Sequence, residues 1–174
     1  MPDSTGADVN VMNEDAGPTL GLRWPIKRTF VNYVRGMTDG KGSATHGASV
    51  TGSMEFLYEN DPGFSSTDEW RFRGDVRFAG HSGLLFVKIA DPRITVVGAD
   101  GVAELTVVDP YGSDTRLKLA TLRVSPQHRP DGIQMWTGTD VRLSAEGVGL
   151  FNDVYQPGEE FDSLEILQRL PRQK

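Results

Sequence analysis

The chain has 174 residues, of which 37% are hydrophobic and 24% charged, a balance typical of one globular domain with a proper core. It has no cysteine, which excludes a disulfide framework, a thiolate zinc site and an iron–sulfur cluster. The net charge of −6 argues against general nucleic-acid binding, and no apolar run approaches the ~18 residues of a membrane-spanning helix.

The first 18 residues are polar and acidic, and Pro18 closes them. They predict a disordered leader (1–18) before a single domain over 19–170, followed by a frayed tail at 171–174. The leader has neither the basic start nor the apolar stretch of a secretory signal. The sequence therefore favours a cytoplasmic protein. An extracellular or cell-surface location is the alternative if an export signal has been removed.

The stretch LRWPIKRTFVNYVRG, residues 22–36, predicts a helix over 25–34, the longest in the chain. Pro25 suits the first helical position, and Gly36 suits a left-handed conformation just past the end. Spacings of four, three and four place four residues on one stripe: Ile26, Phe30, Tyr33 and Met37. We therefore expect the Tyr33 ring to face inward, where its hydroxyl needs a partner.

The chain changes to period-two alternation after a loop over 37–47. Residues 48–58 and 69–78 are predicted strands, and Gly74 marks a bulge in the second. The run Gly80-His81-Ser82-Gly83 predicts a tight turn into a further strand at 84–89. Residues 70–89 are therefore predicted to form an antiparallel hairpin with His81 at its tip.

Further short strands follow at hairpin spacing, namely 93–97, 102–109, 116–124, 133–136, 139–143 and 161–167. Ser144 can cap a short helical turn that runs through Phe151, and Tyr155 follows that turn. The pattern predicts an all-β fold, mainly an antiparallel β-sandwich or barrel, with one or two short α-helices.

Enzyme signatures are weak in this sequence. The run around His81 lacks the spacing of G-x-S-x-G and lies between two strands, so a hairpin turn explains it better. The sequence contains no P-loop, dinucleotide fingerprint or HExxH. His46, His81 and His128 stand far apart, so their spacing does not support a zinc site. We expect a protein that is not an enzyme.

Three segments together resemble the HtaA domain, a heme-binding module of actinobacterial heme-uptake proteins. They are LRWPIKRTFVNYVRG, FRGDVRFAGHSGLLFVKIADPRI and LSAEGVGLFNDVYQPGEEFDSLEI, and they span residues 22 to about 167 in the family's order. The resemblance implies an all-β fold that holds ferric heme b through an axial tyrosine, which matches Tyr33. It also implies that His81 hydrogen-bonds that phenol and that Tyr155 contributes to heme binding. Thr29, one helical turn before Tyr33, has a hydroxyl that could meet a heme propionate.

The implied chemistry is coherent, because tyrosine is a known ligand of heme iron and a nearby imidazole favours the phenolate. It suggests a role in heme transport, transfer or buffering, with a possible heme-transfer partner protein. Two other classes remain open. The chain can be a β-sandwich interaction or structural domain in which Tyr33 and His81 only pack, or a heme-dependent or heme-degrading enzyme. Hemin titration separates the first class from heme binding, and conversion of heme to a bilin would reveal the second.

Overall fold

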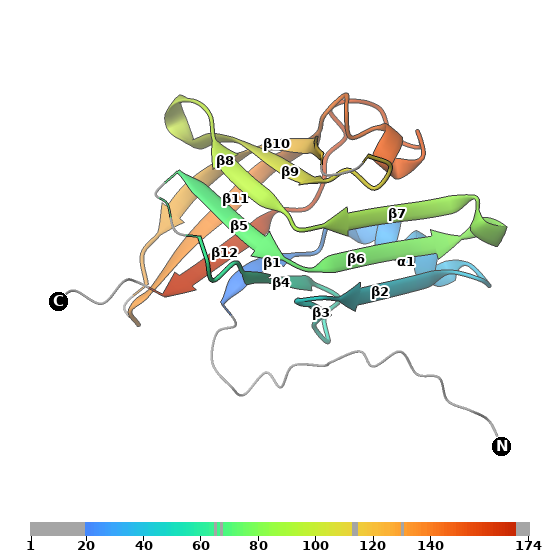
Figure 1. Cartoon of the computed structure of the whole chain (residues 1–174), viewed down its shortest axis with the longest axis horizontal. Coiled ribbons are helices and arrows are strands. Elements are labelled where there is room, and N and C mark those ends of the chain that lie inside the picture. Colours follow the sequence, from blue (N-terminus) through green and yellow to red (C-terminus); the bar gives the residue numbers. More distant parts are fainter. Residues whose placement is uncertain (1–19, 65, 67, 113–114, 130, 170–174) are drawn as a thin grey trace, which may run out of the picture.

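A computed structural model describes residues 20–64, 66, 68–112, 115–129 and 131–169, which form one continuous body of antiparallel strands (Figure 1). The predicted leader (1–18) and tail (171–174) lie outside the described residues. Among the residues described, no helix is both long enough and apolar enough to cross a bilayer.

Eight strands form a closed, barrel-like sheet. The ring closes because β1 pairs with β12 along one edge and with β4 along the other. In order around the ring the strands are β1 (Gly21–Trp24), β12 (Leu164–Arg169), β11 (Ile133–Leu143), β10 (Arg116–Gln127), β9 (Val102–Val108), β8 (Arg93–Val96), β5 (Glu69–Arg73) and β4 (Phe56–Asn60). The short β3 (Ala48–Val50) adds to β4. The prediction of a mainly antiparallel sandwich or barrel is confirmed.

A second sheet of three strands extends from the barrel (Figure 1). It consists of β2 (Lys41–Thr45), β6 (Asp75–Gly80) and β7 (Leu85–Ala90). The chain passes from β5 into β6 at Gly74, whose φ of 150° is a conformation that residues with a Cβ rarely adopt. A Cβ at Gly74 would lie 2.6 Å from that of Ala48. Gly74 therefore separates two strands in different sheets, whereas the sequence predicted a bulge within one strand.

Helix α1 (Arg28–Gly36) packs against the three-stranded sheet, and it is the longest helix in the described residues. Its buried side chains are Phe30, Val31 and Val34. The Phe30 ring meets Phe78 of β6 and Phe151 edge-on, at centroid distances of 5.2 and 5.3 Å. Edge-to-face pairs of this kind add to the burial of the rings, so Phe30 is the anchor of the helix.

The sequence prediction for this helix was wrong in three respects. The helix begins at Arg28, because residues 21–24 form β1 and Ile26 has a φ of 66°. Gly36 ends the helix without a left-handed conformation. Tyr33 does not face inward, since 55% of its surface is exposed. Once Ile26 leaves the helix, the buried stripe is set by Phe30 and its neighbours Val31 and Val34, and Tyr33 turns outward.

Elsewhere in the chain, several observed strand boundaries differ from the predicted ones. Strand β2 was predicted as loop, and the predicted strand 48–58 is interrupted between β3 and β4 by the turn around residue 53. The predicted strands 133–136 and 139–143 are one strand, β11, and the last strand begins at Leu164. The hairpin is confirmed for β6 and β7, which pair antiparallel from Asp75↔Ala90 to Gly80↔Leu85. Strand β5 pairs with β8 instead.

In the part of the chain that the structure describes, three short 3₁₀ turns lie between strands: η2 (His81–Gly83), η3 (Ala99–Gly101) and η4 (Gly149–Phe151). Turn η2 lies at the tip of the β6–β7 hairpin, as predicted for the run around His81. Turn η4 follows Ser144, whose hydroxyl accepts the N–H of Gly147 at 3.0 Å. The hairpin tip, α1 and the η4 region meet at one end of the molecule, because each of them contacts the same aromatic cluster or its neighbours.

Candidate functional site

Tyr33 and His81 lie together at the end of the molecule where the hairpin tip meets α1. The Tyr33 hydroxyl oxygen is 2.6 Å from Nε2 of His81, and the two rings are tilted by 53°. Both side chains are exposed. Helix α1 supplies the tyrosine and turn η2 supplies the histidine, so the pair is assembled from residues 48 positions apart. The arrangement presents one phenol oxygen to solvent, with an imidazole nitrogen beside it.

The backbone of turn η2 has an uncommon conformation. His81 and Ser82 have φ values of 49° and 56°, in the left-handed region that residues with a Cβ seldom adopt. The Asp39 carboxylate accepts the N–H of His81 at 3.2 Å and that of Ser82 at 2.7 Å. These bonds, led by the one from Ser82, lower the pKa of the Asp39 carboxyl. On the other side, the Asn152 amide donates to the Leu84 carbonyl at 3.0 Å.

Tyr155 lies in the aromatic cluster under the site and is half-buried. Its ring contacts those of Phe30, Phe151 and Phe161 at centroid distances of 5.9 to 6.4 Å. Burial, and then the charges of Glu159 and Tyr33, raise the pKa of the Tyr155 phenol. Tyr155 therefore keeps its proton through the neutral range and can donate a hydrogen bond.

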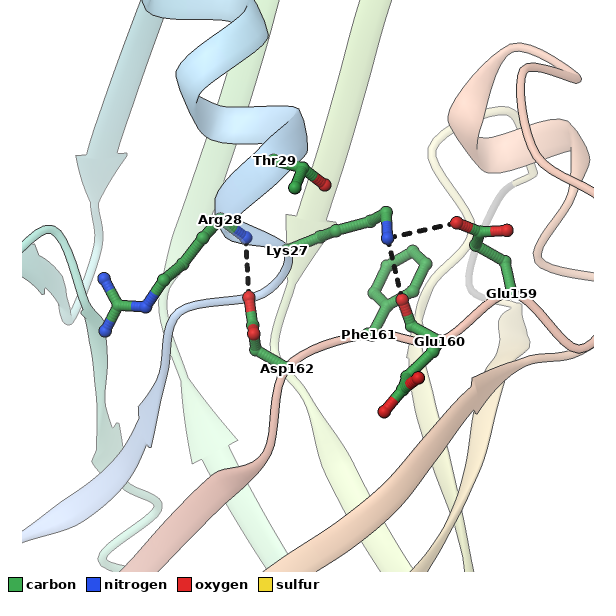
Figure 2. A pocket seen from close by; sticks show the side chains of 7 residues that line it. All are labelled: Lys27, Arg28, Thr29, Glu159, Glu160, Phe161 and Asp162. Carbon is green, nitrogen blue, oxygen red and sulfur yellow. Dashed lines mark hydrogen bonds and ion pairs between the residues drawn. The ribbon is translucent and has the colours of Figure 1, made fainter.

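Thr29 is exposed on the first turn of α1 and lines a polar pocket of about 330 Å³ (Figure 2). Lys27 and Arg28 line the same pocket. The Lys27 ammonium donates to the Glu160 carbonyl at 2.8 Å and pairs with the Glu159 carboxylate at 3.1 Å. The Asp162 carboxylate accepts the N–H of Arg28 at 2.6 Å and so caps the helix. The Thr29 hydroxyl stands one helical turn from Tyr33, at the edge of this pocket.

Two large apolar side chains near the Tyr33–His81 pair are exposed to solvent. Leu84 closes turn η2 and is 81% exposed, and Val154 follows Asn152 and is 63% exposed. The bond between Asn152 and the Leu84 carbonyl holds these two segments together. With Tyr33, they account for three of the five large hydrophobic residues that are exposed in the described chain. The segments on either side of this bond therefore each expose an apolar side chain to solvent.

Sequence reasoning named Tyr33, His81, Tyr155 and Thr29, and all four lie at this end of the molecule. It missed the residues that hold the histidine turn, Asp39 and Asn152, and the exposed apolar pair of Leu84 and Val154. Asp39 lies in a polar run that is typical of a loop, and nothing in its spacing indicates a contact with His81, 42 positions away.

The match to a protein family covers most of the chain. Residues 19–167 match the model of the HtaA family. The chain belongs to the HtaA family. A comparison with curated proteins finds no match to this HtaA-family chain.

Solved structures share the fold of this HtaA-family domain. The N-terminal domain of HtaA from Corynebacterium glutamicum is 21% identical, with a TM-score of 0.69 over 89% of this chain and 100% of that one. HtaB from the same organism, described as a heme binding protein, is 20% identical, with a TM-score of 0.65 over 85% of this chain and 94% of that one. The C-terminal domain of HtaA is 23% identical, with a TM-score of 0.62 over 83% and 92%. At these identities the likeness shows the fold.

Proposed function

We propose that this HtaA-family domain binds ferric heme b, with the Tyr33 hydroxyl oxygen as the axial ligand of the iron. The observation that carries the proposal is the 2.6 Å contact between that oxygen and Nε2 of His81 at an exposed position. A tyrosine kept for packing would bury its ring, whereas Tyr33 is more than half exposed and its oxygen lies beside an imidazole. Tyrosine is an established ligand of heme iron. HtaB from Corynebacterium glutamicum, which shares the fold, is a heme binding protein.

The Tyr33–His81 pair can handle the proton that a phenol loses when it becomes a metal ligand. When neutral His81 carries its proton on Nδ1, Nε2 accepts the Tyr33 O–H across 2.6 Å. When the phenol oxygen gives up its proton, Nε2 can take it, and the resulting N–H donates to the phenolate oxygen. A bond of this charge-assisted kind is roughly twice as strong as a neutral one. His81 thereby stabilises the ionised form of Tyr33 that ferric iron prefers.

The surroundings of Tyr33 fit a flat apolar molecule that carries acidic groups on one edge. Leu84, which follows the turn that carries His81, and Val154 are both exposed, and a porphyrin face would cover apolar surface of this kind. The hydroxyls of Thr29 and Tyr155 can donate hydrogen bonds to the propionates. The raised pKa of Tyr155 keeps that phenol protonated and so able to donate. The residues present therefore suit heme as a bound cargo.

We also propose that the domain carries or buffers heme and passes it to a partner protein, without catalysis. The support is the position of the site. The phenol, the imidazole and the apolar side chains are all exposed at one end of the molecule, where a second protein can reach the cargo. A phenolate favours the ferric state, because a hard anionic oxygen stabilises the higher charge, and this suits carriage of oxidised heme.

Titration of the ligand-free protein with hemin tests the proposed function. We expect a saturable change in the Soret band that ends at one hemin per chain, with the charge-transfer absorption of a ferric tyrosine complex. A linear change without saturation, equal to that of a non-binding control protein, would reject heme binding. Conversion of the bound pigment to a bilin after addition of a reductant would replace the carrier role with an enzymatic one.

A further inference from the structure

Turn η2 holds His81 in a conformation that the local sequence does not favour. Two consecutive residues with a Cβ, His81 and Ser82, have positive φ values of 49° and 56°. Strained backbone of this kind persists where surrounding contacts determine it, and it gathers at functional sites. Contacts from neighbouring segments therefore impose this conformation on the turn that carries His81.

The segment that follows α1 supplies the contacts on one side of the turn. The Asp39 carboxylate spans two successive amides, with one oxygen 3.2 Å from the His81 nitrogen and the other 2.7 Å from the Ser82 nitrogen. Two residues earlier, Met37 packs so closely on Gly80 that a Cβ there would lie 2.5 Å from the methionine sulfur. The end of the helix and the start of the turn are therefore in direct contact.

Chain geometry links this contact to the Tyr33–His81 pair. Asp39 stands three residues after the end of α1 at Gly36, and Tyr33 lies in the last turn of that helix. The carboxylate thus joins the element that carries the phenol to the turn that carries the imidazole. On the far side, the Asn152 amide holds the Leu84 carbonyl at 3.0 Å, so the turn is fixed at both ends.

We propose that Asp39 is a positioning residue, whose carboxylate fixes turn η2 against the end of α1 so that Nε2 of His81 meets the Tyr33 hydroxyl. Its effect on heme rests on the proposed function above, but its effect on the turn does not. Asp39 contacts only backbone N–H groups of the turn among the described bonds, so it acts through His81. Without it, the two amides turn to water, the strained conformation relaxes, and His81 leaves the phenol for part of the time.

The first test uses the ligand-free protein and needs no heme. In Asp39→Ala, we expect faster hydrogen exchange at the Ser82 amide. We also expect the His81 ring resonances to lose most of their response to Tyr33→Phe. Asp61→Ala is the matched control, because the Asp61 carboxylate also accepts a backbone N–H in an exposed turn, that of Gly63 at 3.0 Å. If Asp39→Ala leaves the His81 resonances and their response to Tyr33→Phe unchanged, the positioning role is rejected.

The second test measures heme dissociation into an excess of a tighter heme acceptor. We expect Asp39→Ala to raise the rate about 3- to 10-fold, because His81 stays near the phenol for part of the time. The double variant Asp39→Ala/His81→Ala should lose heme no faster than His81→Ala alone, since Asp39 acts through His81. Additive effects of the two substitutions would overturn the proposal, as would equal rates in Asp39→Ala and Asp61→Ala.

A variant that keeps the shape of the side chain guards against a folding artefact. Asp39→Asn retains one acceptor oxygen for the two amides and should fall between the parent and Asp39→Ala in both tests. If Asp39→Asn raises the heme dissociation rate as much as Asp39→Ala does while hydrogen exchange at the Ser82 amide stays unchanged, the charge of the side chain matters and not its position. That result would reject the proposal. If the parent binds no heme, the proposed function fails, while the resonance test still decides the role of Asp39.

Discussion

Replacement of His81 by alanine should speed the loss of heme while leaving the domain folded. The substitution leaves the proposed iron–oxygen bond in place and removes the partner that lies 2.6 Å from the Tyr33 oxygen. A hydrogen bond to a charged group contributes about 1.5–3 kcal/mol. Because both side chains are exposed, water can replace part of the lost bond, and we expect the lower end of that range. About 1.5 kcal/mol corresponds to roughly a tenfold weaker complex.

The assay is the rate of hemin transfer from the loaded protein to an excess of a tighter heme acceptor. His46→Ala is the matched control. His46 is also exposed and also has a positive φ, 57°, but its described side-chain bond goes to Thr45. The control therefore reproduces the backbone cost of placing alanine in a left-handed conformation. Equal dissociation rates for the parent and His81→Ala would refute a role for His81, as would equal acceleration in both histidine variants.

Two further predictions concern the buried and half-buried tyrosines. Tyr155→Phe should weaken hemin binding less than Tyr33→Phe in the same titration, because it removes one propionate donor and keeps a ring that packs on Phe30. Burial raises the pKa of the Tyr58 phenol well above its usual value near 10, so the folded state keeps a proton that the unfolded chain releases. The free energy of unfolding should therefore be insensitive to this group below pH 10 and fall above it. Urea titrations across that range, with Tyr58→Phe for comparison, measure the effect.

The strands that alternate cleanly could be read from the sequence, because one face of each is buried in the barrel. β9 is the plainest example, with buried Ala103, Leu105 and Val107 alternating with half-buried neighbours. The short strand β1 was not predicted, because its residues were assigned to the same segment as the helix that follows it. Four residues are too few to distinguish the period of a strand from that of a helix. The pairing of β1 with both β12 and β4 makes this segment a strand. Local pattern does not contain that tertiary information.

The facing direction of α1 could not be predicted for a similar reason. A short helix has few turns to fix its phase, and Ile26, which lies outside the observed helix, was counted in the apolar stripe and moved its expected centre toward Tyr33. Tyr33 was consequently expected to be buried, although it is more than half exposed. The residues of the candidate site were named from resemblance to a family, and their role in heme binding stays a prediction. Their surroundings were not named, because Asp39 and Asn152 act through backbone groups that are distant in sequence.

The central claim is that the Tyr33 oxygen binds heme iron, and hemin titration of Tyr33→Phe tests it most directly. The substitution removes one exposed hydroxyl, so the free energy of unfolding should change by about 1 kcal/mol or less. Tyr111→Phe is the control, since Tyr111 is 73% exposed. We predict that Tyr33→Phe, like Tyr33→Ala, loses the charge-transfer absorption and nearly all hemin affinity, whereas Tyr111→Phe titrates as the parent does. A folded Tyr33→Phe protein that binds hemin as tightly as the parent, with an unchanged spectrum, would contradict the claim.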